Sequence, residues 1–90
     1  MLEVTGTFTT SDDLELFTRT WSGDGEPTRG MLIVHGLAEH SGRWGHVARF
    51  FTDRGYAVSG FDLRGHGQSG GTKGHVASFA DFVDDVHGIV

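Results

Sequence analysis

The sequence contains no cysteine, a single proline and few basic residues. Without cysteine, the chain has no disulfide bonds and no thiolate metal ligands. Seven Lys and Arg against twelve Asp and Glu give a formal net charge of −5, so we expect no basic surface for nucleic acid or for an anionic membrane. No apolar run approaches the roughly 18 residues of a membrane-spanning helix. The composition therefore argues against nucleic-acid-binding and membrane-spanning proteins.

Other missing patterns concern location and cofactors. Met1–Thr5 has no basic segment followed by an apolar core, so we expect no signal peptide and take the cytoplasm as the default location. The six histidines form no H-x-x-x-H or H-E-x-x-H pair on one helical face with a carboxylate as third ligand. The glycine-rich stretch lacks the G-x-x-x-x-G-K-[ST] order of a phosphate-binding loop. We therefore expect no metal and no cofactor.

The first third of the chain has the pattern of a β-hairpin. Gly6–Thr10 and Leu14–Trp21 are rich in Thr, Phe and Leu, and the polar residues 11–13 separate them. The composition of Ser22–Gly30 indicates a loop. We therefore expect an antiparallel pair of strands at the start of a sheet.

The middle of the chain has a strand–helix–strand pattern. The continuous apolar run at Met31–His35, bounded by turn signals, is typical of a buried parallel strand. From Trp44 the apolar residues recur at positions 44, 47, 48 and 51, the spacing of an amphipathic helix, and Gly55 suits a left-handed stop after it. Tyr56–Phe61 is a second apolar strand. Together these segments predict a right-handed βαβ unit and an α/β fold.

A polar loop and a second helix are expected next. The composition of Arg64–Gly74 is too polar and too rich in glycine for a helix or strand, and predicts a surface loop. Ser78 suits a helix N-cap, and Asp81 lies near the positive end of the helix dipole. The expected apolar stripe of this helix comprises Phe79, Phe82, Val83, Val86 and Val90. Because the stripe is still running at residue 90, we expect residues 1–90 to be a fragment of one domain.

Three segments resemble a known family. Residues 35–44, HGLAEHSGRW, resemble the HG-x-x-EHSGR-aromatic segment of monoacylglycerol lipases and related lysophospholipases, which have the α/β-hydrolase fold. Residues 62–71, DLRGHGQSGG, resemble the D-x-RGHG-x-S loop that is widespread in that fold, and residues 74–85 resemble the downstream G-x-x-x-x-F-x-x-x-x-x-D segment. The resemblance implies the N-terminal part of an α/β-hydrolase sheet, in which Tyr56–Phe61 lies between the second hairpin strand and Met31–His35.

The same resemblance implies roles for residues of the first segment. The backbone N–H of Leu37 would be one donor of an oxyanion hole, and His35 and Gly36 would support the turn that presents it. A glycine after a buried strand lets the chain turn sharply, so that the amides after it face the crevice. Glu39 and Arg43 match positions at the polar end of the pocket, near the glycerol head of the substrate. The alternative for these two residues is a weak ion pair on a solvated turn.

One serine matches a nucleophile pattern by spacing alone. Gly67–Gly71 has the spacing G-x-S-x-G, but a nucleophile elbow lies directly between a buried strand and a helix. No helix is expected here before Ser78, and the resemblance places Ser69 in a structural loop. We therefore expect the serine, histidine and aspartate of the catalytic triad to be absent from this chain.

The resemblance implies a serine hydrolase of monoacylglycerol or lysophospholipid-like esters, for which this chain supplies an oxyanion amide and part of a head-group pocket. Without a triad, the chain by itself is expected to be inactive. Two alternatives stay open. The same half of the fold serves peptidases, haloperoxidases and epoxide hydrolases. The chain could also be a non-catalytic segment that associates with itself or with the remainder of a hydrolase chain, because Met31–His35 would have an open edge.

Overall fold

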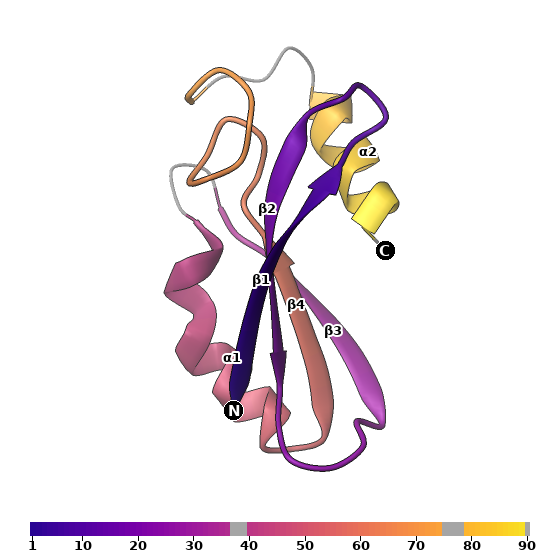
Figure 1. The fold of residues 1–90 in the computed structure, drawn as a ribbon, viewed down its shortest axis with the longest axis vertical. Helices are drawn as coiled ribbons and strands as arrows, with labels where there is room; N and C mark the ends of the chain where they lie inside the picture. The colour runs from indigo at the N-terminus through magenta and orange to yellow at the C-terminus, as the bar shows by residue number, and fades with distance from the viewer. Residues whose placement is uncertain (37–39, 75–78, 90) are drawn as a thin grey trace.

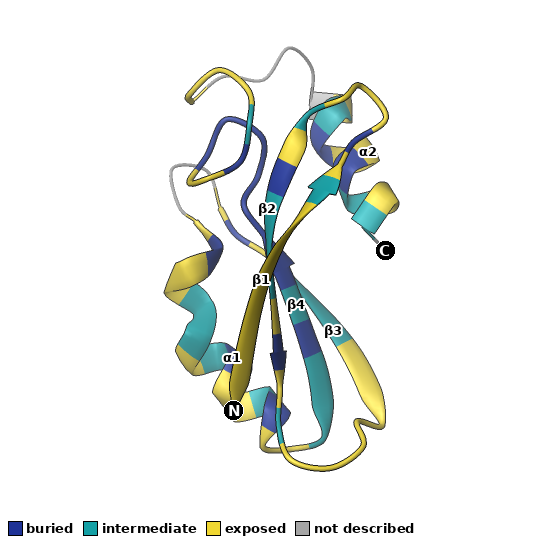
Figure 2. Cartoon of the chain, in the orientation of Figure 1, coloured by how far each residue is buried: buried dark blue, intermediate teal, exposed yellow. Residues whose placement is uncertain are grey.

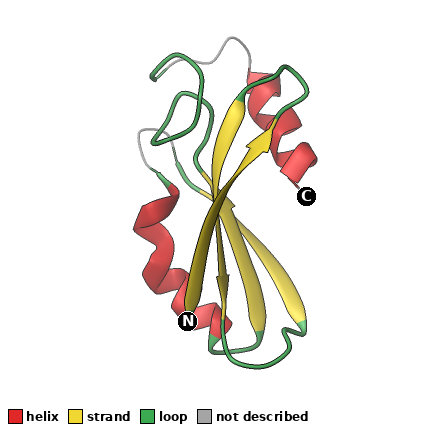
Figure 3. Ribbon diagram, in the orientation of Figure 1, coloured by secondary structure: helices red, strands yellow, loops and turns green. Residues whose placement is uncertain are grey.

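The structure is a computed structural model that describes residues 1–36, 40–74 and 79–89 of the chain (Figure 1). Within these ranges, strands and helices are joined by turns and loops (Figure 3). The elements, in chain order, are β1 (Leu2–Thr9), β2 (Glu15–Ser22), β3 (Arg29–Val34), the 3-10 turn η1 (Ser41–Trp44), α1 (Gly45–Thr52), β4 (Tyr56–Phe61) and α2 (Phe79–Ile89). The α/β class expected from the sequence is confirmed.

The strands form one sheet in the order β1-β2-β4-β3. β1 and β2 form the expected antiparallel hairpin, in which Leu2 lies opposite Ser22 and Thr9 opposite Glu15. β4 pairs antiparallel with β2 and parallel with β3. The expected position of β4 between β2 and β3 is therefore confirmed. Among the described elements, β3 forms one edge of the sheet.

Helices α1 and α2 pack against opposite faces of the sheet, each over its own core. The core on the α1 side comprises Trp21, Ala48 and Val58. The core on the α2 side comprises Leu16, Phe61, Leu63 and Phe82. Within β2 and within β4, the residues of the two cores are an odd number of positions apart, so their side chains point to opposite faces. The buried positions of the sheet therefore lie along its two central strands (Figure 2).

The first helix differs from its expected form at its start. A 3-10 turn precedes it, and α1 begins at Gly45 rather than at Trp44. Ala48 faces the sheet and is fully buried. Gly55 has a φ of +88°, the left-handed conformation that the expected stop after this helix requires. β4 begins directly afterwards, and its bounds are those expected from the sequence.

The expectation of a surface loop at Arg64–Gly74 is wrong for the first half of this segment. It contains no helix or strand, but Arg64, His66 and Ser69 are each at most 8% exposed. The backbone N–H of Gly70 donates a hydrogen bond to the carbonyl oxygen of Glu15 at 2.7 Å and so holds the segment against β2. The buried side chains of Arg64, His66 and Ser69 are hydrogen-bonded to other groups of the chain, which explains how polar residues can be buried here.

The apolar stripe expected for the second helix is only partly present. Phe82 is buried, and Val86 and Ile89 pack at the edge of the same core. Val83 is 44% exposed, contrary to the expectation, because no described element covers it beside the open edge of β3. The structure does not describe Ser78, the expected N-cap, or Val90, and it does not describe the side chain of Phe79.

Candidate functional site

The carboxyl ends of β3 and β4 bring two polar side chains together. These strands are parallel and pair Val34 with Phe61, so His35 and Asp62 follow at the same edge of the sheet. Ligand sites of open α/β sheets lie at this edge. His35 is 3% exposed and Asp62 is 1% exposed. Polar side chains that are so far removed from water need hydrogen-bond partners.

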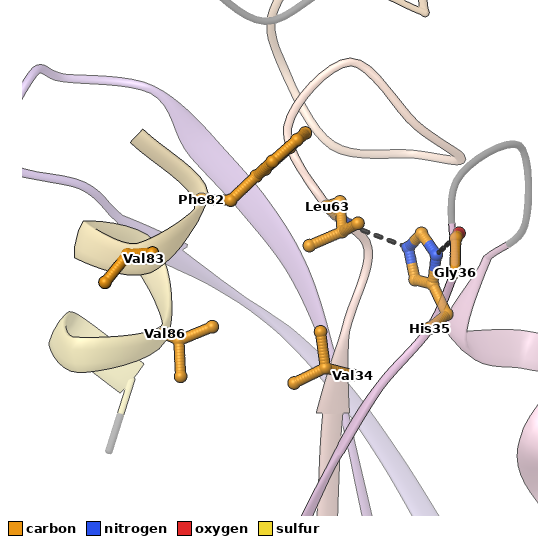
Figure 4. Close-up of a pocket in the computed structure, with 7 residues that line it drawn as sticks. All are labelled: Val34, His35, Gly36, Leu63, Phe82, Val83 and Val86. Atoms are coloured by element: carbon orange, nitrogen blue, oxygen red, sulfur yellow. Dashed lines mark hydrogen bonds between the residues drawn. The ribbon is translucent and has the colours of Figure 1, made fainter. Parts of the chain in front are cut away.

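His35 joins the two loops that leave these strands. Its Nε2 accepts a hydrogen bond from the backbone N–H of Leu63 at 2.9 Å. Its Nδ1 lies 2.6 Å from the carbonyl oxygen of Gly36. Both interactions are visible in the close-up of the region (Figure 4). The imidazole ring therefore ties the start of the loop after β3 to the start of the loop after β4.

Asp62 organises the same two loops from the other side. Its Oδ1 accepts hydrogen bonds from the backbone N–H of Ser41 at 2.7 Å and from the Ser41 hydroxyl at 2.6 Å. Its Oδ2 accepts the backbone N–H of Gln68 at 2.9 Å. Burial raises the pKa of the Asp62 carboxyl, but the hydrogen bonds from Gln68 and Ser41 outweigh burial and hold this pKa below its ordinary value of 3.8. Asp62 is therefore an ionised hydrogen-bond acceptor.

Ser41 connects Asp62 to the two strands of the hairpin. Its hydroxyl, which donates to Asp62, accepts a hydrogen bond from Arg19 Nε at 3.0 Å. Arg19 Nη1 lies 3.3 Å from the Glu3 carboxylate of β1. The guanidinium also lies over the Phe17 ring, 5.0 Å from its centroid. This series of contacts fixes the turn at which η1 begins.

Ser69 has a structural role. Its hydroxyl donates to the backbone carbonyl of Asp62 and accepts the backbone N–H of Phe17 at 2.8 Å. The residue is 6% exposed, and turns and bends rather than a helix follow it at residues 70–74. A nucleophile elbow instead holds its hydroxyl free above the sheet. The G-x-S-x-G spacing at this position therefore does not mark a nucleophile.

Arg64 ties the same loop to α2. It is 7% exposed, and its guanidinium donates paired hydrogen bonds to Asp85 of α2 and to Asp12 of the β1–β2 turn. The hydrogen bond from Arg64, with a further one from Thr10, holds the pKa of the Asp12 carboxyl well below its usual range. The loop after β4, the hairpin and α2 are thus joined through one side chain.

An apolar pocket of about 280 Å³ opens beside the His35 junction (Figure 4). It is lined by Val34, His35, Gly36, Leu63, Phe82, Val83 and Val86. Val34 at the end of β3 is 47% exposed, and Val83 of α2 is 44% exposed. The pocket therefore lies where an apolar segment added beside β3 would be buried.

The structure describes three of the five predicted site residues. It places His35 and Gly36 at the junction of the two loops. Arg43 lies in η1 with an exposed side chain, and its guanidinium has no ion pair within the described part of the chain. Leu37 and Glu39 lie outside the described residues, as do the expected oxyanion donor and any Glu39–Arg43 pair.

Sequence reasoning missed Asp62 and Ser41 as the organisers of this region. Both belong to the segments that carry the family resemblance, but the resemblance gave no indication of their contact, which joins residues 21 positions apart. A usable signal was present. Asp62 follows the strand that pairs parallel with β3, and a carboxylate at that place lies beside the loop after β3.

Metal clusters and membrane-spanning helices are both absent from the described ranges. No group of three His, Asp or Glu side chains there could hold a metal ion. None of the helices in these ranges has the length and apolar composition to cross a bilayer.

The family match covers the strands and helices that build this junction. The model of the family described as "Serine aminopeptidase, S33" matches residues 25–90. The chain belongs to this family. The matched residues contain β3, α1, β4 and α2, and leave out the two strands of the hairpin.

The chain is also similar to named lipases of the α/β-hydrolase class. It is 41% identical over 70 residues to the monoacylglycerol lipase of Mycolicibacterium smegmatis, covering 78% of this chain and 25% of that protein. It is 40% identical over 76 residues to the monoglyceride lipase of Homo sapiens, covering 84% of this chain and 25% of that protein. The resemblance to monoacylglycerol lipases is therefore confirmed, and the chain spans about a quarter of these relatives.

Solved structures with less similar sequences share the fold. A carboxyl esterase from Bacillus coagulans superposes with a TM-score of 0.81 at 23% sequence identity, over 97% of this chain and 30% of the esterase. The Epoxide Hydrolase A of Mycobacterium thermoresistibile gives a TM-score of 0.76 at 22% identity, over 98% of this chain and 28% of that one. The chain therefore has the fold of the N-terminal part of an α/β-hydrolase.

Proposed function

We propose that residues 1–90 form the N-terminal part of one serine ester hydrolase domain that acts on monoacylglycerol or lysophospholipid-like esters. In this proposal the backbone N–H of Leu37 is one oxyanion-hole donor, and His35 and Gly36 support its turn. The observation that carries the proposal is the buried His35, which bonds to Gly36 and Leu63 where the two parallel strands end. The similarity to the M. smegmatis monoacylglycerol lipase supports this choice of substrate.

Glu39 and Arg43 are proposed to contact the polar head of the substrate. The exposed guanidinium of Arg43, without an ion pair in the described ranges, leaves five N–H donors for hydroxyl or phosphate oxygens. The turn that carries Arg43 is held in place by Ser41 and Asp62. A fixed turn loses less entropy when its side chains bind a ligand.

The nucleophile of the proposed reaction is not assigned to this chain, so the test uses a chimera. Residues 25–90 replace the matching segment of the M. smegmatis monoacylglycerol lipase, and hydrolysis of a monoacylglycerol is measured. We expect the chimera to be active and the 90-residue chain alone to be inactive. An inactive chimera that is folded by circular dichroism would contradict the proposal.

A variant of the chimera tests the oxyanion donor directly. Leu37→Pro removes the backbone N–H and should lower kcat by about 10²–10³-fold, the usual cost of one lost oxyanion donor. Leu37→Ala keeps the N–H and serves as the matched control, with kcat close to that of the unmodified chimera. Equal losses in the two variants would mean that the side chain, not the amide, is what matters.

A second variant tests the head-group contact. Arg43→Gln should raise KM for a monoacylglycerol and leave KM for a p-nitrophenyl ester unchanged, because only the first substrate has a glycerol head. The exposed Arg49 of α1 offers the control, Arg49→Gln. A rise in KM for both esters would show a general effect on the pocket and would remove Arg43 from the proposed head-group site.

Peptide hydrolysis is the second candidate, because the matching family is described as a serine aminopeptidase. The same N-terminal part could serve either reaction, since an oxyanion hole stabilises the tetrahedral intermediates of esters and amides alike. Activity of the unmodified full-length hydrolase on aminoacyl-p-nitroanilides, exceeding that on monoacylglycerols, would favour the peptidase.

Association is the third candidate, and it concerns the open edge of β3. The edge strand and the apolar pocket beside it could bind the remainder of a hydrolase chain or, in its absence, a second copy. Sedimentation velocity of the 90-residue chain should then show a defined oligomer that Val34→Lys disrupts. Val4→Lys, on the exposed outer strand β1, is the matched control. A monomer with cooperative unfolding would contradict this candidate.

A cytoplasmic location is proposed only as the default, since no feature of the composition points to another compartment. Fractionation of cells that express the hydrolase, followed by detection of this segment, tests the location. Recovery in the membrane or secreted fraction would contradict it.

A further inference from the structure

We propose that His35 is a positioning residue whose neutral ring holds the two loops of the site together and whose protonation releases them. The two contacts of the ring, from Nδ1 to Gly36 and from Nε2 to Leu63, form what we term the His35 bridge. This role of His35 rests on the proposed oxyanion turn and adds a dependence on pH to that turn. The bridge itself, however, is a property of the described residues and can be measured without any enzymatic activity.

The two partners of the ring determine which nitrogen carries the proton. The backbone N–H of Leu63 can only donate, so Nε2, at 2.9 Å from it, is an acceptor without a proton. The carbonyl oxygen of Gly36 can only accept, so Nδ1, at 2.6 Å, carries the proton and donates it. Only the neutral ring with its proton on Nδ1 satisfies both partners.

Holding the Gly36 carbonyl has a direct consequence for the turn. This carbonyl and the next amide N–H belong to one planar peptide unit, in which the trans arrangement points them in opposite directions. Glycine has no Cβ to restrict rotation of that unit, so a hydrogen bond to its carbonyl is an effective restraint. The His35 bridge therefore acts on the peptide unit that contains the proposed oxyanion donor.

Protonation removes half of the bridge. An imidazolium carries a proton on both nitrogens, so Nε2–H would face the N–H of Leu63, donor against donor. The Leu63 amide, buried in the α2-side core region, would be left without its acceptor. Protonation is thus expected to move His35 or Leu63 and to loosen the link between the two loops.

The groups around the ring set the response to acid. Two groups of the loop after β4 lie near the ring. The ionised carboxylate of Asp62 favours a proton on His35. The ring of His66 lies 5.5 Å from that of His35, centroid to centroid, and a charge on His66 would disfavour that proton. His66 donates its own Nδ1–H to the carbonyl of Arg64. The α2 residues that share the pocket with His35 are apolar, namely Phe82, Val83 and Val86 (Figure 4). The two imidazoles and the one carboxylate are therefore the titrating groups to follow.

The first test reads the ring directly. Long-range ¹H–¹⁵N spectra of the chain labelled with ¹⁵N-histidine should show His35 protonated on Nδ1 and unprotonated on Nε2 at neutral pH. On acidification, the amide signal of Leu63 should shift together with the Nε2 signal. The same spectra of the lipase chimera provide the measurement in a whole hydrolase. A ring protonated on Nε2 at neutral pH, in either protein, would overturn the proposal.

The second test separates the two contacts by substitution in the chimera. An asparagine amide reaches about as far as Nδ1, so His35→Asn can still donate to Gly36 but cannot accept from Leu63. A glutamine amide reaches about as far as Nε2, so His35→Gln has the opposite ability. We expect kcat of His35→Gln to be about tenfold lower than that of His35→Asn, with similar KM values, because misdirecting an oxyanion donor lowers kcat.

The pH profile completes the test and has its own control. Protonation of the triad histidine supplied by the lipase lowers kcat in acid for every form of the chimera. Both His35 variants should lack the additional decline of kcat that is expected from protonation of His35, since neither an asparagine nor a glutamine side chain titrates. His87→Asn, at an exposed position of α2, should keep that decline. Equal kcat values for the two His35 variants, or an unchanged profile, would overturn the proposal. If the unmodified chimera is inactive, the proposed function fails, and the spectra still decide whether the bridge exists.

Discussion

The guanidinium of Arg64 and the carboxylate of Asp85 form a two-bonded ion pair, with Nε 2.8 Å from Oδ2 and Nη2 2.7 Å from Oδ1. The Asp85 side chain is 1% exposed and that of Arg64 is 8% exposed. On its other side, Arg64 also bonds to Asp12 of the hairpin. The pair joins the loop that carries His66 to the helix that carries Phe82, and so maintains one wall of the pocket beside His35.

Removing the charge of Asp85 should therefore destabilise the chain. Asp85→Asn removes the negative charge that lies against the buried, positively charged guanidinium of Arg64. We expect the free energy of unfolding, measured in urea, to fall by about 3 kcal/mol. Asp84→Asn, at the exposed neighbouring position, is the control and should change it by less than about 0.5 kcal/mol. Equal effects of the two substitutions would mean that the ion pair contributes little.

Stability should fall in acid because of Asp62. Hydrogen bonds hold the pKa of its carboxyl in the folded chain below the ordinary value of 3.8, despite burial. The ionised carboxylate thus contributes stability that is fully present above pH 3.8 and is lost as the pH falls toward the folded-state pKa. Asp62→Asn should flatten this part of the stability profile, and Asp53→Asn, on the surface, should not. Identical acid profiles of the two variants would contradict the role of Asp62.

Gly67 should not tolerate a side chain. It has a φ of +49°, and a Cβ there would lie 2.3 Å from Oδ2 of Asp62. We expect Gly67→Ala to cost about 3 kcal/mol, from the strained φ together with the forced shift of the carboxylate. Gly74→Ala is the matched control, because its φ of +69° imposes similar strain and no atom of the described residues lies within 4 Å of a Cβ there. The control should cost about 1 kcal/mol, and the difference between the two, measured by thermal unfolding, reports the contact with Asp62.

Ser69→Ala should affect folding and not chemistry. The substitution leaves the Phe17 N–H without an acceptor and removes a donor to Asp62, at an expected cost of about 1–3 kcal/mol. The exposed Ser22 provides the control, Ser22→Ala, with little change. An organophosphonate probe should not label Ser69. Covalent labelling of this serine, or turnover of a p-nitrophenyl ester by the chain that Ser69→Ala abolishes, would identify it as a nucleophile after all.

Elements that depend on local pattern could be predicted from the sequence. The predicted bounds of β4 agree with the structure, since its short length, its aromatic and β-branched residues and the glycine before it favour a strand over a helix. The left-handed Gly55 and the hairpin followed from the same kind of reasoning. Motif resemblance added the order of the strands in the sheet.

Elements that depend on distant contacts could not be predicted in this way. The polar composition of Arg64–Gly74 predicted a surface loop. The loop is half buried instead, because its polar groups bond to residues far away in the chain. Ser69 bonds to Phe17, 52 positions away. Likewise, periodicity placed Val83 in the core, although a helical stripe is buried only where another element covers it.

By itself, the sequence determined the α/β class, the hydrolase family and the His-Gly turn at the end of β3, because periodicity and motifs are properties of neighbouring residues. Only the tertiary structure decided that Asp62 is an ionised acceptor, that Ser69 is bonded to backbone groups and that His35 bridges two loops. The physical reason is that burial removes water from polar side chains. Their protonation and geometry then depend on the partners that the fold brings to them.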